Sequence, residues 1–315
     1  MPSSAMSARE NYLAAIRFAS PERVPLGRES VALSFQFEGN FRKADWTDAW
    51  GVGWEVGIAD TVPFPRLNPL PDLDRLDGYR VPDPDRLAFT EELRDELASV
   101  NRAGHVVYGS LTYLLFERAW AVMGLEGFLA ALVTHPGAAH EFLHAIAGYA
   151  RRVFERYLDL GVDGISFSED LGSQRALMLS PSMVREFLLP EYRFMFAPAL
   201  RAGKIVNFHS CGCIEAIAGD LAGIGVTVLN PVQARANDLR AVKRATAGRT
   251  ALQGGIDTDL LIRGTPAEVR AETERVMAIL KPGGGYVCAP DQTIPGIPQA
   301  NLVALWTTAE AIGRY

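Results

Sequence analysis

The stretch "PGAAHEFLHAIAGYARRVFERYLDLGVDGISFSED", residues 136–170, places a long amphipathic segment directly before a short and mostly apolar run. The length and periodicity of the first part are typical of a helix, and the run "DGISFSED" has the length of a buried strand. The stretch therefore predicts a helix that leads into a strand, which is the repeating unit of α/β folds.

The same alternation continues from about residue 104 to the end of the chain. The apolar runs "HVVYGS", "KIVNFHS", "VTVLNPV", "RTALQGGID" and "GYVCAPD" alternate with longer amphipathic segments. Buried strands joined through helices predict a parallel sheet covered by helices. With "VPLGRE" near residue 24 as the first strand and one further strand expected before residue 104, we predict an α/β fold, a (β/α)8 TIM barrel with an irregular N-terminal extension.

We expect a single domain over residues 1–315, with an irregular part over 1–103 and regular βα repeats over 104–315. A chain of 315 residues, 48% of them hydrophobic, can bury a sizeable core without disulfides. The extension is dense in Pro, Gly and Asp and carries Trp46, Trp50 and Trp54. A loop or short hairpin and an aromatic wall over a substrate pocket are both compatible with that composition.

Composition also bounds the partners and the compartment. The net charge of −6 and a pI near 5.5 argue against nucleic acid and anionic membrane surfaces as partners. The sequence shows no signal peptide and no run long enough to span a bilayer. Three cysteines, two of them one residue apart, are a poor disulfide framework and suit a reducing compartment. We therefore expect a cytoplasmic protein.

Polar residues gather at the ends of the predicted strands. Parallel strands of a barrel place all their carboxyl ends on one rim, so these side chains are expected to converge on one mouth. The residues at the strand ends are Ser168, Glu169, Asp170, His209, Cys211, Asn230, Gln253, Asp257, Cys288 and Asp291.

Three of these residues form a candidate metal site. His209, Cys211 and Cys288 offer one imidazole and two thiolates, which leave one tetrahedral position open, as in catalytic zinc sites. A buried histidine beside a small apolar residue is the alternative. Cys213 is expected to pack in the first turn of the next helix, although a structural zinc site would need it as the fourth ligand.

The remaining rim residues are candidates for catalysis and substrate binding. Glu169 and Asp170 are candidate catalytic carboxylates that could act as a general base, as a fourth zinc ligand or as partners that orient His209. They could equally cap the segment that follows them. The candidate substrate-binding residues are Asn230, Gln253, Asp257 and Asp291.

Two other groups are expected to be structural. Glu117, next to Arg118 in the helical segment "LLFERAWAVMG", is expected to be solvated or ion-paired. His140 and His144 have the spacing of a helical metal pair, but they belong to the outer ring of helices, so we expect a surface pair.

Several motifs resemble the uroporphyrinogen decarboxylase superfamily. They include "GVDGISFSEDLGSQRALMLSPSMVREFLLPEY", "HSCGCIEAIAGDLAGIGVTVLNPVQ", "LQGGIDT" and "KPGGGYVCAPDQTIPGIPQANLVAL". The resemblance is strongest from about residue 160 onward and implies a (β/α)8 barrel. One branch of the superfamily decarboxylates uroporphyrinogen without a cofactor. The other comprises zinc methyltransferases that act with corrinoid proteins, such as the methylcobalamin:coenzyme M enzymes.

The zinc branch is the closer resemblance. Its H-x-C…C pattern matches His209, Cys211 and Cys288, whereas the counterpart of the decarboxylase arginine motif, "PERVPLGRESVALSF", offers only Arg28 beyond the turn. A polycarboxylate substrate needs several fixed cations.

The resemblance implies a Zn²⁺-dependent methyltransferase that moves a methyl group between a corrinoid and a small-molecule methyl donor or thiol acceptor. The chain has no D-x-H-x-x-G corrinoid motif, so cobalamin would come from a corrinoid protein or enter free. A cofactor-free decarboxylase and a non-catalytic ligand-binding barrel are the alternatives.

Overall fold

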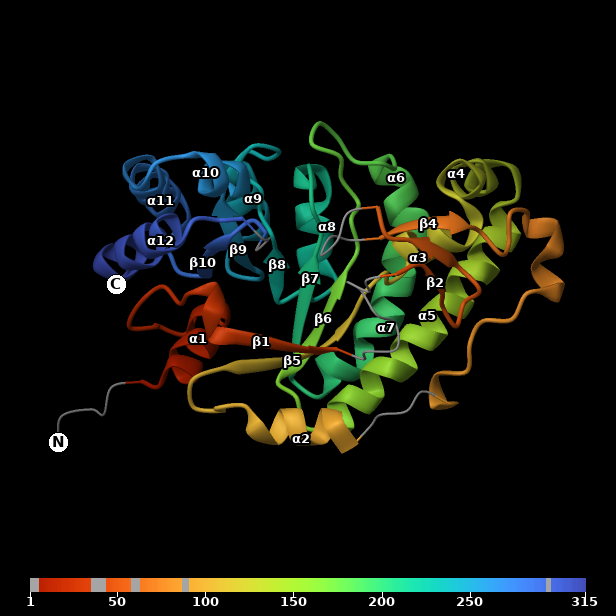
Figure 1. Ribbon diagram of the computed structural model, residues 1–315, viewed down its shortest axis with the longest axis horizontal. Helices are drawn as coiled ribbons and strands as arrows, with labels where there is room; N and C mark the ends of the chain where they lie inside the picture. The colour runs from red at the N-terminus through yellow and green to blue at the C-terminus, as the bar shows by residue number, and fades with distance from the viewer. Residues whose placement is uncertain (1–5, 35–43, 58–62, 87–90, 293–295) are drawn as a thin grey trace.

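The computed structural model describes residues 6–34, 44–57, 63–86, 91–292 and 296–315. Its main element is a seven-stranded parallel sheet in the order β1-β5-β6-β7-β8-β9-β10 (Figure 1). The strands are β1 (Ser30–Ser34), β5 (Val106–Leu111), β6 (Gly164–Ser168), β7 (Ile205–His209), β8 (Val228–Asn230), β9 (Ala251–Ile256) and β10 (Tyr286–Pro290).

The sheet is curled, and the segment before β1 returns to the opposite edge. Leu26 forms a parallel bridge with Cys288 of β10, and the Cys288 N–H donates to the carbonyl of Pro25 at 2.9 Å. The strand predicted at "VPLGRE" is thus a single bridge followed by a short 3-10 helix, Gly27–Glu29. The seven strands of the sheet in the described residues are one fewer than the eight predicted.

Helix α5 (Pro136–Asp159) and strand β6 confirm the unit predicted from residues 136–170. Buried side chains recur along one side of α5 at helical spacing, among them Phe142, Ile146 and Val153. The Tyr157 hydroxyl donates to the Ser110 carbonyl at 2.9 Å, and its ring lies so close to β5 that a Cβ on Gly109 would approach it to 2.2 Å. A glycine in β5 therefore lets α5 pack tightly onto the sheet.

Further helices flank the sheet (Figure 1). They are α1 (Ala8–Ile16), α2 (Glu91–Ser99), α3 (Phe116–Met123), α4 (Leu125–Thr134), α6 (Pro181–Met183), α7 (Leu189–Arg201), α8 (Ala218–Gly223), α9 (Leu239–Thr246), α10 (Thr258–Arg263), α11 (Pro266–Leu280) and α12 (Gln299–Ile312). A one-turn π-helix, Val184–Leu188, joins α6 to α7. None of the helices in the described ranges is long and apolar enough to span a membrane.

Buried side chains form two clusters on opposite faces of the sheet. The larger, outer cluster lies between the sheet and the helices. The inner cluster alternates with it along the strands, as the pleat requires, and includes two residues of α1. Its members are Tyr12, Ile16, Val106, Tyr108, Ile205, Val228, Ala251 and Val287. Helix α1 therefore covers the inner face of the sheet at the level of these residues.

The irregular N-terminal part contains a small antiparallel sheet of β2 (Trp46–Thr47), β3 (Gly53–Glu55) and β4 (Phe64–Leu67). This confirms the hairpin interpretation of the tryptophan-rich segment. Trp46 stacks on Trp54 with ring centroids 5.9 Å apart, and Trp50 packs edge-on against Tyr149 of α5 at 4.7 Å. The tryptophans thus pack within the extension and dock it on the helices.

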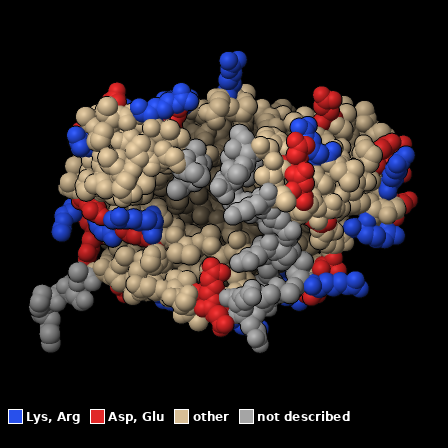
Figure 2. All heavy atoms as spheres, in the orientation of Figure 1, with Lys and Arg blue, Asp and Glu red and all other residues tan. Residues whose placement is uncertain are grey.

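Figure 2 shows that the viewed face is hollowed near its middle, over the sheet, and that most charged side chains lie around its margin.

Candidate metal centre and active-site rim

The carboxyl ends of the central strands lie at one level, as the sequence predicts. Ser168 of β6 pairs with His209 of β7, and His209 pairs with Asn230 of β8. His209 and Asn230 share the inner face with Ile205 and Val228, because residues two apart in a strand point to the same side.

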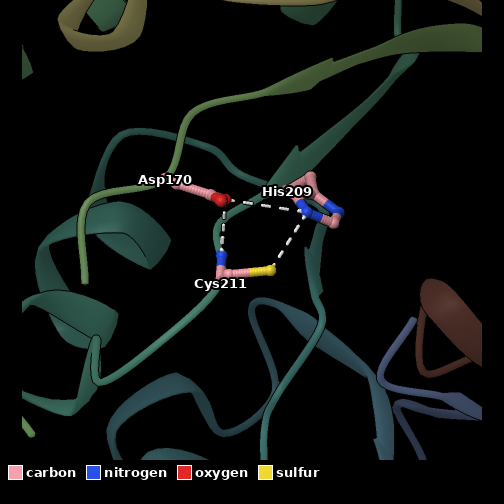
Figure 3. Close-up of side chains that lie close together, drawn as sticks. All are labelled: Asp170, His209 and Cys211. Atoms are coloured by element: carbon pink, nitrogen blue, oxygen red, sulfur yellow. Dashed lines mark hydrogen bonds and ion pairs between the residues drawn. The ribbon is translucent and has the colours of Figure 1, made fainter. Parts of the chain in front are cut away.

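Asp170, His209 and Cys211 converge just beyond β6 and β7 (Figure 3). His209 Nε2 lies 3.5 Å from Cys211 Sγ and 3.7 Å from Asp170 Oδ1. One donor atom from each residue lies within 4.8 Å of the other two, and this is the one such group of three His, Cys, Asp or Glu side chains in the described residues. Imidazole, thiolate and carboxylate are all ligands of zinc.

The loop that carries Cys211 is held by hydrogen bonds from both neighbouring loops. The Cys211 N–H donates to Asp170 Oδ1 at 2.8 Å, and Ser210 Oγ accepts the Leu171 N–H at 3.0 Å. Gly212 has φ +81°, and a Cβ there would lie 2.1 Å from the Gly172 carbonyl oxygen. The turn therefore needs glycine, and the two loops approach each other closely.

Gln233 and Asn237 support the same loop from the segment after β8, and sequence reasoning missed both. Gln233 Oε1 accepts the Gly212 N–H at 2.9 Å, and Asn237 Oδ1 accepts the Ile214 N–H at 2.9 Å. Both side chains are nearly inaccessible to solvent. Buried amides need hydrogen-bond partners, so their position just after a strand end was the signal that could have identified them.

Burial has the largest effect on the pKa values of Cys211 and His209. Burial raises the pKa of Cys211 to about 12, and the carboxylate of Asp170 adds to the rise, while the Gln292 Nε2–H that donates to Sγ at 2.9 Å opposes it. Burial also lowers the pKa of His209, against the charge of Asp170. Without a bound cation the site thus favours a neutral thiol and a neutral imidazole.

Glu169 is buried and fully engaged, although it adjoins Asp170. Its carboxylate accepts the backbone N–H groups of Leu115, Phe116 and Glu117 at 3.0, 2.7 and 3.2 Å, and the Tyr192 hydroxyl at 2.6 Å. Burial raises its pKa to about 7. These contacts match the capping alternative, but the helix that Glu169 caps is α3, not the segment that follows it.

We predicted that Glu117 is solvated or ion-paired, but the structure shows a buried side chain. It is 8% exposed, and its Oε2 has no hydrogen-bond partner in the described residues. Burial, followed by the charges of Asp170 and Glu169, raises its pKa well above the usual range. Helix α3 is buried on nearly all sides, and the apolar residues around "FERAWAVM" were the signal that its charged groups are buried too.

Cys288 does not join the cluster. Its neighbour Val287 belongs to the inner cluster, whereas Cys288 belongs to the outer one together with Tyr286. The thiol is fully buried, and burial raises its pKa to about 12. The structure therefore brings together two of the three predicted zinc ligands, His209 and Cys211, and leaves the third on the other face of the sheet.

Three of the four candidate substrate-binding residues form hydrogen bonds or ion pairs within the protein. Asp257 accepts the Leu260 N–H at the start of α10 and pairs with Arg235. Asp291 accepts the Gly255 N–H at 2.7 Å, and burial raises its pKa to about 7. Gln253 accepts from the Tyr12 hydroxyl at 3.1 Å. Asn230 is half-buried on the inner face at the level of His209.

The two histidines of α5 lie outside this site. His140 stacks on Phe187 with centroids 4.5 Å apart, and the exposed His144 places Nδ1 3.0 Å from Glu191 Oε2. Neither belongs to the group of converging ligands found in the described part of the chain.

A curled parallel sheet with ionisable groups at the carboxyl ends of its strands defines an α/β protein with one polar rim. Residues 46–312 match the uroporphyrinogen decarboxylase (URO-D) family, and the chain belongs to this family. Family membership supports an enzymatic function. No curated protein matches the chain in sequence.

A solved structure shares the fold of this chain over nearly its whole length. A methyltransferase from Methanosarcina mazei superposes with a TM-score of 0.78 at 18% identity, covering 97% of this chain and 99% of that one. A B12-independent methionine synthase from Shewanella sp. W3-18-1 reaches a TM-score of 0.49 at 12% identity, covering 70% of this chain and 64% of that one. At these identities the likeness concerns the fold.

Proposed function

We propose that the chain is a metal-dependent methyltransferase that moves a methyl group between a corrinoid and a thiol or methylated small molecule. The observation that carries the proposal is the approach of His209 Nε2 and Cys211 Sγ to 3.5 Å at the end of β7. The URO-D family and the fold shared with the Methanosarcina methyltransferase support it.

The donor atoms fit a zinc ion in part. His209 and Cys211 offer an imidazole nitrogen and a thiolate on the rim, which is the ligand chemistry of catalytic zinc. Cys288, the third ligand implied by the family resemblance, lies on the outer face. We therefore assign the metal to His209 and Cys211 and treat the third ligand separately below.

Zinc at this position would supply Lewis acidity, which favours the thiolate form of a thiol substrate or polarises the heteroatom that leaves a methylated one. The protein orients the donors: Gln292 donates to Cys211 Sγ, and the Cys211 N–H holds the Asp170 carboxylate beside His209. Asn230, which pairs with His209 in the sheet, would bind the substrate.

The corrinoid would be supplied by a corrinoid protein or enter free, because the chain lacks the D-x-H-x-x-G motif. We also infer that the segment at Leu26, which bridges to β10, takes the place of an eighth strand and closes the sheet into a (β/α)8 barrel.

A decarboxylase of the same family is the second candidate, and its requirement for fixed cations disfavours it. Arg28, the lone counterpart of the decarboxylase arginines, pairs with Glu310 at 2.6 Å and lies over the Trp306 ring of α12. The rim instead gathers the carboxyl groups of Glu117, Glu169 and Asp170. A polycarboxylate would be repelled there unless each charge were paired.

The test combines zinc analysis of the purified chain with a spectroscopic assay for demethylation of methylcobalamin by a panel of thiols. We expect the wild type to retain zinc and to demethylate methylcobalamin, and we expect His209→Ala to lose both, with activity down by about 100-fold or more. His144→Ala, a matched change on the exposed side of α5, should retain both. A zinc-free wild type that decarboxylates a porphyrinogen would replace the proposal with the second candidate.

A further inference from the structure

We propose that Asp170, not Cys288, is the third protein ligand, so that the metal is held by one carboxylate, one imidazole and one thiolate. This inference rests on the proposed metal-dependent function. It gives the site a ligand set different from the His-Cys-Cys set that the family resemblance implies.

The two donor distances measured from His209 are close to those of a tetrahedral site, and the carboxylate of Asp170 lies within 4.8 Å of Cys211 Sγ. Zinc bonds of about 2.0–2.1 Å to nitrogen or oxygen and about 2.3 Å to sulfur place tetrahedral N and S ligands about 3.6 Å apart, and N and O ligands about 3.4 Å apart. His209 Nε2 lies 3.5 Å from Cys211 Sγ and 3.7 Å from Asp170 Oδ1. One ion can therefore contact all three donors after small side-chain adjustments.

The sheet itself separates Cys288 from this position. His209 lies four residues after Ile205 of the inner cluster, and Cys288 follows Val287 of the same cluster by one. Residues an even number apart share a face and adjacent residues do not, so the imidazole and the Cys288 thiol point to opposite sides. To bring the thiol inward, β10 would have to shift its register by one residue, and Val287 would then leave the inner cluster.

The charges around the site also call for a cation. In the described part of the chain, neither Asp170 nor Glu117 forms an ion pair with lysine or arginine. Glu117 is nine-tenths buried with Oε2 unpartnered. A divalent ion held by Asp170 and Cys211 would offset the negative charge of Asp170 and would favour the carboxylate form of Glu117 over the neutral form that burial favours.

The proposed ligands Asp170, His209 and Cys211 carry the same total charge as one histidine and two cysteine thiolates. One carboxylate and one thiolate neutralise a dication, and His209 remains neutral. Asp170 and His209 are both partly exposed, by 41% and 27% of their side chains. A substrate thiol or heteroatom could therefore reach a metal held by these residues from the solvent side.

X-ray absorption at the zinc edge of the zinc-loaded full chain counts the sulfur ligands directly. We expect one sulfur at about 2.3 Å, with nitrogen and oxygen at about 2.0–2.2 Å in the remaining positions. Two protein sulfurs in the wild type, measured without added thiol, would overturn the assignment.

Zinc affinity of variants, measured by competition with a chelator, gives a second readout. Asp170→Asn should weaken zinc binding by about 100-fold or more, since loss of outer partners alone costs 10–100-fold. Cys288→Ala should leave the affinity unchanged, as should the matched control Asp259→Asn at a carboxylate that pairs with Arg235 and Arg263. Thermal unfolding of each variant confirms that it is folded. An unchanged Asp170→Asn variant, or a weakened Cys288→Ala variant, contradicts the proposal.

The ligand assignment and the proposed function can fail separately. One sulfur per zinc without demethylation of methylcobalamin would keep the assignment and remove the activity. Two sulfurs with full demethylation would keep the activity and remove the assignment. A wild type that binds no zinc would remove both.

Discussion

One cysteine follows β7 and another lies within β10, and the two are buried in different parts of the molecule. Cys211 lies just beyond β7, where the chain has turned toward the rim, and it approaches His209 and Asp170. Cys288 lies within β10 and points into the layer between sheet and helices. Residue type alone therefore does not make a ligand, since the face of the strand decides which side the thiol reaches.

The same division separates two neighbouring carboxylates. Glu169 accepts four hydrogen bonds and caps α3, whereas Asp170 lies partly exposed beside His209. Glu169 holds the start of α3, and the side chain of Asp170 stays in part accessible to solvent.

The largest expected effect is on the stability of Glu169→Ala. Removal of the carboxylate leaves three buried N–H groups and a tyrosine hydroxyl without an acceptor, so we expect the free energy of unfolding to fall by about 3–5 kcal/mol. Chemical denaturation measures this change. Asp170→Ala, the matched change one residue along, should cost less than about 1 kcal/mol. Equal losses in the two variants would break the contrast between them.

Glu169 should also make the stability of the protein depend on pH. The pKa of Glu169 is about 7 in the folded chain, above the ordinary value of 4.5, so the folded state binds more protons between these values. The free energy of unfolding of the metal-free protein should therefore fall as pH rises from about 4.5 to about 7, by up to about 3 kcal/mol. Denaturation over this range measures the slope, which Glu169→Gln should flatten. A stability that rises with pH over this window would contradict the prediction.

A smaller effect distinguishes the cysteines in the metal-free protein. Cys288→Ser replaces a fully buried thiol beside the Tyr286 hydroxyl with a more strongly hydrated hydroxyl, and it should lower the free energy of unfolding by about 1–3 kcal/mol. Cys213→Ser, at a half-buried position, should change it by about 0.5 kcal/mol or less. Thermal or chemical unfolding compares the two variants. A neutral Cys288→Ser would indicate that its thiol is more accessible than the structure shows.

Much of the fold could be predicted because helix and strand periods are local. The five apolar runs from residue 104 onward coincide with β5, β7, β8, β9 and β10, and the helix before β6 is α5. The first strand was predicted a few residues too early, at "VPLGRE", because the segments that pair with this part of the chain are distant in sequence. Gly27 approaches Ala289 so closely that a Cβ would lie 2.7 Å from the Ala289 Cβ, and the chain turns there before β1 begins.

The candidate site was predicted only in part for a related reason. The rim position of His209 and Cys211 follows from the order of strands, and the resemblance to the zinc branch names both. Strand β10 is buried at all five positions, so its sequence carries no alternation that shows which face Cys288 occupies. The burial of Glu117 could have been inferred from the apolar residues that surround it in α3.

The network around Cys211 has a further consequence for how an ion would be taken up. Ser210 ties the loop to Leu171, and Gln233 and Asn237 tie it to the segment after β8. Glu169, the residue before Asp170, is held by the first residues of α3. Capture of an ion would then freeze few rotamers, in contrast to small zinc domains that fold only around their metal. Such a scaffold would keep its shape through cycles of loading and removal, and its rigidity would select ions by size and preferred angle.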